Sequence, residues 1–315
     1  MENSPERALV LGANGFIGSH VVDSLSERGY AVRAFGSFGD DTVRFNQSEN
    51  VEIYQGNFLN RAEIKDALED VDYVFHLIST TTPATAEADP MVDIETNIQG
   101  SVALFQECVA RGGIKRVLYT SSGGTVYGER QGDQAFSEEE PLRPISPYAI
   151  GKVTIENYLR YFNVKHGLSS TSFRIANPYG PRQPKHRKQG VIPIFLDKAM
   201  NQEALSVLGD GSMVRDYVYV RDIADMMVET LKHNPQYDVY NLGSGKGYSL
   251  AEILVSIENV TGQKPEVSYS QDVPSTFIHT SILDSSRYSE EFGDKNLIDL
   301  DTGVALTYDY IKGQR

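Results

Sequence analysis

The chain has 315 residues, of which 43 are Asp or Glu and 29 are Lys or Arg, giving a formal net charge of −14. This length can bury a substantial core in one large domain or in two unequal ones. The acidic balance argues against a nucleic-acid-binding surface, although local arginines and helix N-termini can still bind a phosphorylated substrate.

Cysteine content and hydropathy bear on the compartment. The single cysteine, Cys108, excludes an internal disulfide and is typical of a reducing compartment. It lies in an apolar helical stretch, which predicts a packing role. No stretch is long and apolar enough to span a bilayer, and the first residues lack a signal-peptide core. We therefore expect a cytoplasmic protein without membrane insertion, and we predict no metal site.

A glycine-rich turn follows the first predicted strand. Residues 7–11 form a short apolar run, an amphipathic stretch covers 19–28, and a second apolar run covers 31–35. This order of strand, turn, helix and strand predicts a βαβ unit whose turn places backbone N–H groups against a pyrophosphate. The sequence therefore predicts a dinucleotide bound by the turn residues Gly12, Asn14, Gly15, Phe16, Ile17 and Gly18.

The end of the second strand usually carries an acid that binds the hydroxyls of the adenosine ribose. Here that position is Gly36, and Asp40 or Asp41 would have to reach back to replace the acid. Without a carboxylate, the 2′-phosphate of NADP would not be repelled. The predicted cofactor is therefore NAD, with NADP not excluded.

Polar residues follow the next predicted strands. Residues 51–58 are predicted as a third strand whose last residues, Asn57 and Phe58, line the adenine. A fourth strand over 72–78 leads into a polar loop over 79–82, at the carboxyl end where ligands bind in open α/β sheets. A long helix over about 91–111 and a fifth strand over 115–120 come next. The further cofactor-binding residues predicted from these segments are Leu77, Ile78, Ser79 and Asn97.

Tyr148 and Lys152 stand four residues apart in a predicted helix that Pro147 opens. A phenol with a pKa near ~10 is a poor base at neutral pH, and a neighbouring ammonium favours the phenolate. Such a pair is suited to acid–base catalysis. An isolated pair at this spacing is more often part of an ordinary amphipathic helix, so the other motifs decide the interpretation.

Strands alternate with helices, which predicts an α/β fold with a doubly wound parallel sheet (Rossmann-like) and a smaller α/β substrate-binding domain. A sixth strand over 169–176 runs into a segment rich in Gly, Pro and charge, so we place the domain change near residue 178. Further on, we expect helices over 190–199 and 249–261, strands over 205–208, 237–243 and 266–269, and a helical tail. The dinucleotide-binding domain would cover 1–177 and about 236–262, and the substrate-binding domain about 178–235 and 263–315.

Five motifs, at residues 12–18, 121–127, 148–152, 177–183 and 215–222, together resemble the extended short-chain dehydrogenase/reductase family, and within it the nucleotide-sugar 4-epimerases. The resemblance implies that Tyr148 removes the proton from a sugar 4-hydroxyl while the hydride on the same carbon goes to a tightly held nicotinamide. The resulting 4-keto sugar turns about its phosphate linkage and takes the hydride back on its opposite face. Lys152 would bind the nicotinamide ribose and lower the pKa of Tyr148.

The family's third catalytic residue is a Ser or Thr that hydrogen-bonds the sugar 4-oxygen. Its position falls on Gly123, which has no hydroxyl, so Thr125 is our first choice for the replacement and Ser122 our second. The alternative is that Gly123 and Gly124 only allow close packing. Family dehydratases carry an Asp-Glu pair here and nucleotide-sugar decarboxylases a Glu. Residues 122–125 carry no carboxylate, so the sequence favours neither dehydration nor decarboxylation.

For the substrate, a nucleotide-diphosphate sugar, the resemblance implies that Asn177 contacts the sugar or phosphate. The backbone of Gly190 and Val191 would contact the diphosphate, and Arg215 would bind it by charge-assisted hydrogen bonds. The alternative for this arginine is a salt bridge with one of the neighbouring acids, Asp216 or Asp222.

Two positions depart from the family pattern or bear on the choice of sugar. A second phosphate-binding arginine of the family aligns with Pro274, and Arg182 or Arg187 is the candidate to replace it. The alternative is that the nucleotide is bound more weakly. The position that limits the sugar 2-substituent falls near Ser281. A small residue there would leave room for an N-acetyl group.

We thus expect an NAD-dependent nucleotide-sugar 4-epimerase acting on a UDP-hexose or UDP-N-acetylhexosamine. The alternative enzyme is an NAD(P)H-dependent nucleotide 4-keto-sugar reductase, which Gly36 would permit. A non-catalytic dinucleotide-sensing module is a third interpretation, but it need not retain Tyr148 and Lys152. By resemblance we also expect a homodimer formed through the helices over 91–111 and 147–166.

Overall fold

The computed structural model describes residues 5–39, 43–130, 132, 134–184, 190–270 and 277–314. The chain forms two compact units: Met1–Ser122, Ser146–Phe173 and Ala224–Tyr240 make the first, and Gly123–Ile145, Arg174–Ile223 and Asn241–Arg315 the second. Residues 224–235 thus fall in the first unit, whereas the predicted boundaries place them in the second. Residues 123–145, 174–177 and 241–262 fall in the second unit, whereas the predicted boundaries place them in the first. The assignment of cofactor and sugar to the two units stays a prediction.

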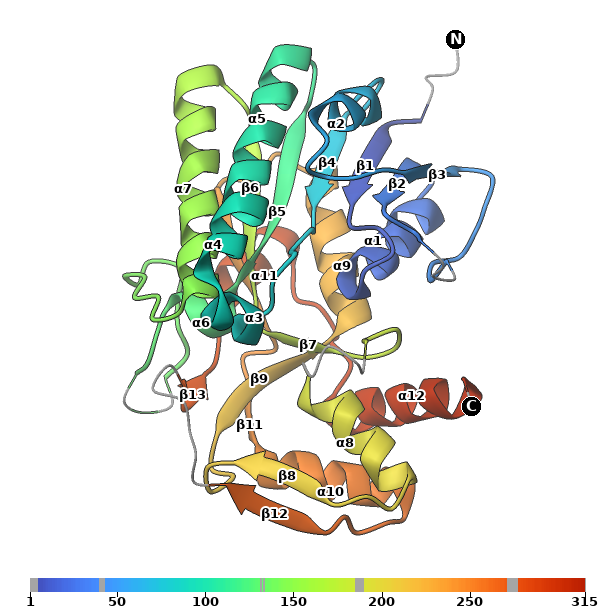
Figure 1. Ribbon diagram of the computed structural model, residues 1–315, viewed down its shortest axis with the longest axis vertical. Coiled ribbons are helices and arrows are strands. Elements are labelled where there is room, and N and C mark those ends of the chain that lie inside the picture. Colours follow the sequence, from blue (N-terminus) through green and yellow to red (C-terminus); the bar gives the residue numbers. More distant parts are fainter. Residues whose placement is uncertain are drawn as a thin grey trace. The chain divides into compact units, whose positions relative to one another are not determined.

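The first unit is built on a seven-stranded sheet with the order β10-β6-β5-β4-β1-β2-β3 (Figure 1). From β3 to β5 every neighbouring pair is parallel. This confirms the predicted α/β fold with a doubly wound, Rossmann-like sheet. The strands are β1 (Arg7–Leu11), β2 (Ala31–Gly36), β3 (Val51–Gln55), β4 (Tyr73–His76), β5 (Arg116–Ser122), β6 (Ser170–Ile175) and β10 (Val239–Leu242), the last two of which run into the second unit.

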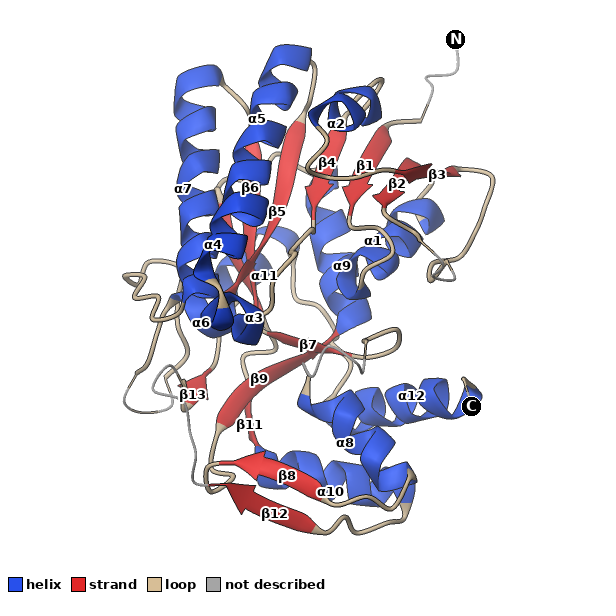
Figure 2. Cartoon of the chain, in the orientation of Figure 1, coloured by secondary structure: helices blue, strands red, loops and turns tan. Residues whose placement is uncertain are grey.

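Helices connect these strands (Figure 2). The predicted helix over 91–111 is three successive segments, because a π-helical stretch separates two α-helical ones. The π-helix adds a residue to the turn and re-aims the side chains that follow. The helical elements are α1 (Phe16–Glu27), α2 (Arg61–Ala67), α3 (Pro83–Ala88), α4 (Pro90–Val92), the π-helix η1 (Asp93–Ile98), α5 (Gln99–Arg111), α7 (Pro147–His166), α9 (Val220–Glu229) and the 3₁₀ helix η3 (Thr230–Lys232).

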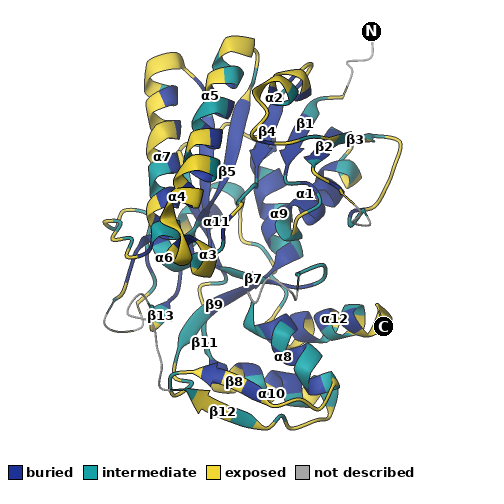
Figure 3. Ribbon diagram, in the orientation of Figure 1, coloured by how far each residue is buried: buried dark blue, intermediate teal, exposed yellow. Residues whose placement is uncertain are grey.

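The core of the first unit lies between the sheet and the layer formed by α2, α5 and α7 (Figure 3). Leu9 and Leu11 of β1 face this layer, so the alternating residues of the same strand face the other side, where α1 packs on β1 and β2. Cys108 is buried in the core, and burial raises the pKa of its thiol to about 12. Its predicted packing role is confirmed.

Residues of α9 belong with the first unit because their polar side chains bond to α1. Asp225 accepts hydrogen bonds from the hydroxyl of Ser24 at 2.7 Å and from the guanidinium of Arg28 at 2.9 Å. These contacts explain why the residues after Ile223 belong to the first unit, although the predicted boundary places them in the second.

The second unit combines two small sheets with helices. β9 pairs antiparallel with β11 and parallel with β13 and β7, while β8 and β12 form a parallel pair. Its hydrophobic core gathers side chains from α8, α10 and α12. The elements are α6 (Gly123–Val126), β7 (Asn177–Tyr179), α8 (Val191–Met200), β8 (Leu205–Leu208), β9 (Val214–Tyr219), β11 (Gly247–Ser249), α10 (Leu250–Thr261), β12 (Val267–Ser270), β13 (Thr280–Ser281), α11 (Ser286–Phe292) and α12 (Leu300–Gly313).

Candidate active site

The glycine-rich turn between β1 and α1 has the geometry of an anion-binding turn. Gly12 adopts a φ of +87°, and the Gly15 N–H donates to its carbonyl at 2.9 Å. A Cβ on Gly18 would lie closer than 3.0 Å to the Gly12 carbonyl oxygen, so the turn and helix approach too closely for a side chain. Gly15 is the N-cap of α1 and no side chain caps the helix. The first N–H groups of α1 are therefore suited to binding a phosphate.

The side chain of Asn14 organises the loop after β2. Its Oδ1 accepts from the backbone N–H of Arg44 at 2.9 Å. Gly36 ends β2, and the Phe38 ring lies 3.4 Å from where its Cβ would be. Phe38 is buried, with a φ of +48°. An aromatic ring therefore packs beside the predicted acid position; Asp40 and Asp41 lie outside the described residues.

Asn57 and Phe58 serve local structure. Oδ1 of Asn57 accepts from the backbone N–H of Leu59 at 3.0 Å, in the turn before α2. The Phe58 ring is buried with its centroid 5.2 Å from that of His76, under Gly100 of α5. Their predicted contact with an adenine stays a prediction.

The loop after β4 is bonded to the π-helix. The Thr80 N–H donates to Oδ1 of Asn97 at 2.9 Å, and Nδ2 of Asn97 donates to Oγ1 of Thr81 at 2.9 Å and to Oδ1 of Asp93 at 2.8 Å. Ile78 packs beside Gly12. The structure thus places Ile78 beside the glycine turn, and Ile78, Ser79 and Asn97 beside α7 in one pocket. Their predicted contact with the cofactor stays a prediction.

Tyr148 lies in the first turn of α7. Ser146 caps this helix by accepting from the Ala149 N–H at 3.3 Å, and Pro147 occupies the first helical position. The Tyr148 hydroxyl is hydrogen-bonded to the side chains of Ser122 and Ser79. Burial and the nearby carboxylate of Asp93 raise the pKa of Tyr148 to about 12, although the two serine hydroxyls lower it.

Lys152 is buried beside Tyr148. Its Nζ donates to the Thr120 carbonyl at 2.9 Å and lies 5.6 Å from the centre of the Tyr148 ring. Burial lowers the pKa of Lys152 to about 8, although Asp93 and Glu156 raise it. The predicted lowering of the Tyr148 pKa by Lys152 stays a prediction, because the causes of the observed shift are burial, Asp93 and the two serines. The Lys152 ammonium is directed at a strand carbonyl, and the groups that lower the phenol pKa are the two serines.

Which hydroxyl replaces the one missing at Gly123 stays a prediction, and the structure places the two candidates in different units. A Cβ on Gly123 would lie closer than 3.0 Å to Cδ1 of Leu283, so this glycine allows close packing within the second unit. The hydroxyl that bonds to Tyr148 belongs to Ser122, the second choice. Thr125, the first choice, lies in α6 of the second unit.

The predicted sugar- and phosphate-binding residues lie in the second unit. Nδ2 of Asn177 donates to the Asp216 carbonyl at 3.1 Å, and Gly190, with a φ of +94°, directly precedes Val191 at the start of α8. Ser281 is buried on β13, where it pairs with Arg215 of β9.

Arg215 is largely bonded to backbone carbonyls. Its guanidinium donates to Val214 at 2.9 Å, to His279 at 2.8 Å and to Ile278, and its Cζ lies 5.7 Å from the centre of the Phe277 ring. Burial lowers its pKa. A bound diphosphate would therefore have to add to these partners or displace them. Pro274 and Arg187 lie outside the described residues.

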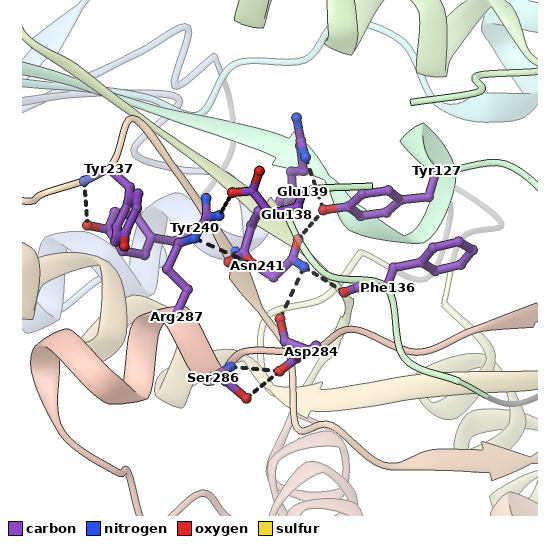
Figure 4. A network of polar contacts seen from close by, with 11 residues as sticks. Tyr127, Phe136, Glu138, Glu139, Tyr237, Tyr240, Asn241, Asp284, Ser286 and Arg287 are labelled. Carbon is purple, nitrogen blue, oxygen red and sulfur yellow. Dashed lines mark hydrogen bonds and ion pairs between the residues drawn. The ribbon is translucent and has the colours of Figure 1, made fainter. Parts of the chain in front are cut away.

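A buried polar network, which sequence reasoning missed, joins the segment after β5 to the end of β10 (Figure 4). Tyr127 donates its hydroxyl to Oδ1 of Asn241 at 2.7 Å, and the Asn241 N–H donates to Oε1 of Glu138 at 2.7 Å. Arg287 lies 3.8 Å from the Glu138 carboxylate. The network anchors the segment that carries Gly123 and Thr125 within the second unit.

A small pocket in the first unit collects the central residues. It is lined by Ile78, Ser79, Asp93, Asn97, Tyr148, Gly151, Lys152 and Ile155. Within the described ranges, no group of three or more His, Cys, Asp or Glu side chains is arranged to hold a metal ion. Among the same residues, no helix combines the length and apolarity needed to cross a membrane.

Comparison with known proteins shows which family model matches this chain and which proteins are similar to it. The model of the NAD-dependent epimerase/dehydratase family matches residues 8–243. The dTDP-4-dehydro-6-deoxyglucose reductase of Escherichia coli is 31% identical, over 96% of this chain and 97% of that protein.

Two solved structures are similar over nearly their whole length. The UDP-glucose 4-epimerase of Thermotoga maritima, solved with UDP-glucose, is 33% identical with a TM-score of 0.90, covering 98% of this chain and 99% of that one. The UDP-glucose 4-epimerase of Thermus thermophilus, in complex with NAD, is 29% identical with a TM-score of 0.89 and the same coverage.

Proposed function

Because the chain belongs to the NAD-dependent epimerase/dehydratase family, we propose that it is a nucleotide-sugar 4-epimerase that inverts the 4-hydroxyl through a transient 4-keto sugar. The observation that carries this proposal is the hydrogen bond between Tyr148 and Ser122, beside a buried Lys152. The similarity to epimerases solved with UDP-glucose and with NAD supports a UDP-hexose or UDP-N-acetylhexosamine as substrate.

The residues present fit a dinucleotide. The close approach of Gly18 to Gly12 and the uncapped start of α1 form a cradle of backbone N–H groups that a side chain would fill. Bound there, NAD would supply a hydride acceptor. Tyr148 would take the 4-hydroxyl proton, Ser122 would orient that oxygen and Lys152 would hold the nicotinamide ribose.

The chemistry at the end of β5 favours simple oxidation and reduction of the sugar. Residues 122–125 are Ser, Gly, Gly and Thr, so this segment carries no carboxylate for elimination or decarboxylation. In the second unit, Asn177, Gly190, Val191 and Arg215 are proposed to bind the sugar and its diphosphate. The small Ser281 beside Arg215 on the neighbouring strand is consistent with a 2-N-acetyl group.

A second candidate is a nucleotide 4-keto-sugar reductase that exchanges its cofactor. Two observations favour it: the 31% identity to the dTDP-4-dehydro-6-deoxyglucose reductase and the absence of an acid at Gly36. The two enzymes differ in cofactor use, since an epimerase keeps its NAD and shows no net oxidation or reduction.

The test begins with native mass spectrometry of freshly purified protein, which identifies a retained NAD or NADP. Incubation with UDP-, dTDP-, GDP- and CDP-sugars then shows which sugar inverts. Inversion without cofactor turnover supports the epimerase, whereas stoichiometric NADPH consumption on a 4-keto sugar supports the reductase.

Tyr148→Phe is the decisive variant. We expect a loss of about 10²- to 10⁴-fold in kcat, the range for removal of a general acid–base group. Tyr269→Phe is a control for loss of a tyrosine hydroxyl, because Tyr269 is exposed on β12 and lies outside the proposed dimer surface. Full activity of Tyr148→Phe would refute both enzyme proposals.

We also propose that the protein is a cytoplasmic homodimer. One side of α7 exposes large apolar side chains: Ile150 (50% exposed), Tyr158 (40%), Tyr161 (51%) and Val164 (79%). Exposed apolar residues concentrated on one helix are typical of an interaction surface. Val164→Glu should convert a dimer to monomers in size-exclusion chromatography with light scattering, and a wild-type monomer would refute the proposal.

A further inference from the structure

Asp93 is a buried carboxylate to which the sequence assigned no role. It begins the π-helix and is 3% exposed. Its Oδ1 accepts hydrogen bonds from the hydroxyl of Thr81 and from Nδ2 of Asn97. Both donors belong to segments that line the pocket of Tyr148 and Lys152, so the carboxylate is held from two sides.

The other carboxylate oxygen faces α7. Oδ2 lies closer than 3.0 Å to where a Cβ of Gly151 would be, so a larger residue at this position would displace the carboxylate. Gly151 directly precedes Lys152 and lies three residues after Tyr148. The missing side chain thus lets an acid approach the helix backbone between the two proposed catalytic residues.

We propose that Asp93 is a positioning residue for the Tyr148–Lys152 pair, whose negative charge holds the buried Lys152 in its ammonium form and keeps Tyr148 protonated until the cofactor and sugar are bound. This proposal rests on the proposed function for its catalytic meaning. The electrostatic part concerns only side chains of the first unit.

The charged and titratable groups around Lys152 come from each neighbouring element. On α7 these are Tyr148 and Glu156, and Glu156 also raises the pKa of Lys152. On β4, burial and Lys152 lower the pKa of His76 to about 3.

On β5, burial raises the pKa of Tyr119 well above its usual value. His76 and Tyr119 are thus neutral around pH 7, and Asp93 and Glu156 supply the negative charge. Of these two carboxylates, Asp93 raises the pKa of Lys152 more than Glu156 does. Asp93 also raises the pKa of Tyr148.

The test compares three variants that each remove one carboxylate. Asp93→Asn keeps the size of the side chain, Glu156→Gln removes the acid that acts on Lys152, and Glu95→Gln removes an exposed acid from the same π-helix. The readout is the titration of Lys152 in cofactor-free protein, followed by NMR of ¹³Cε-labelled lysine. The Lys152 signal is assigned by its loss in Lys152→Met.

We expect Asp93→Asn to lower the titration midpoint of Lys152 by about 1 pH unit, the lower end for loss of a nearby opposite charge. Glu156→Gln should lower it by less, and Glu95→Gln should leave it unchanged. An unchanged midpoint in folded Asp93→Asn would overturn the proposal. If Asp93→Asn does not fold, Gly151→Ala, which displaces the carboxylate, must lower the midpoint; no change there would overturn the proposal equally.

Enzyme kinetics then separates this proposal from the proposed function. If wild-type protein converts a nucleotide sugar, the pH profile of kcat for Asp93→Asn should move to lower pH on both limbs, because the carboxylate raises both pKa values. Glu156→Gln should move only the alkaline limb. If no sugar is converted, the proposed function fails, while the lysine titration still decides the role of Asp93.

Discussion

The ammonium of Lys152 donates a hydrogen bond to the backbone carbonyl of Thr120 at 2.9 Å, near the carboxyl end of β5. The lysine is thereby fixed to the strand that also carries Ser122. Its charge is directed at a main-chain dipole, and two serine hydroxyls bond to the phenol of Tyr148. The site is therefore a set of buried groups positioned by β5, α7 and the loop after β4.

Ser122→Ala should reduce activity more than Thr125→Val. The Ser122 hydroxyl bonds to Tyr148 and lowers the phenol pKa, so its loss makes it harder for Tyr148 to reach the phenolate form. A hydrogen bond to a charged group corresponds to about 10- to 100-fold in kcat. We expect a loss of that size for Ser122→Ala and less than about 3-fold for Thr125→Val. Equal losses in the two variants would contradict the assignment.

Lys152→Met should stabilise the cofactor-free protein at pH 7. Burial lowers the pKa of Lys152 from 10.5 to about 8. The pKa of Lys152 is lower in the folded chain than in the unfolded chain. This lysine therefore lowers the free energy of unfolding as the pH falls from about 10.5 through about 8, and the full decrease is present at pH 7.

The size of this effect follows from the same shift. The pKa shift of Lys152 corresponds to a cost of about 3 kcal/mol in the free energy of unfolding, which Lys152→Met would remove. The same substitution loses the hydrogen bond to Thr120, which reduces the gain by roughly 1 kcal/mol. Urea unfolding should therefore give a gain of about 2 kcal/mol at pH 7, accompanied by loss of activity. Destabilisation by Lys152→Met would show that the ammonium is not penalised by burial.

Gly18→Ala should weaken dinucleotide binding. Its Cβ would lie closer than 3.0 Å to the Gly12 carbonyl, so the turn that presents the N–H groups of α1 must shift. We expect at least about a 10-fold increase in the Kd for NAD and a loss of stability of about 1–3 kcal/mol. Gly313→Ala is the matched control, because nothing lies within 4 Å of a Cβ at that position.

Gly36→Asp should shift cofactor preference towards NAD. The new Cβ would lie 3.4 Å from the Phe38 ring, an ordinary contact, so the fold should accept it. A carboxylate at this position can bind the ribose hydroxyls and repel a 2′-phosphate. Isothermal titration should show at least about a 10-fold rise in the ratio of NADP Kd to NAD Kd, with Gly36→Asn as the uncharged control. An unchanged ratio would place the selectivity elsewhere.

The sequence predicted the elements that have strong local signals. The glycine turn, the strands of the parallel sheet and the helix that begins after Ser146 all follow from apolar periodicity, glycine spacing and capping residues. The pair Tyr148 and Lys152 could be found because four residues is one helical turn. The prediction of a single long helix over 91–111 missed the π-helix, which carries no comparable local signal.

Hydrogen-bond partners far apart in the chain were decided only by the tertiary structure. Which hydroxyl reaches Tyr148, which carbonyl binds Lys152 and why Gly151 lacks a side chain all depend on how α7, β5 and the π-helix pack. The direction of the Tyr148 pKa shift also depends on burial and on Asp93, which belongs to a different helix. Residue types and spacing therefore determined the fold and the chemical groups, whereas packing determined their protonation, because desolvation and through-space charge are properties of the folded chain.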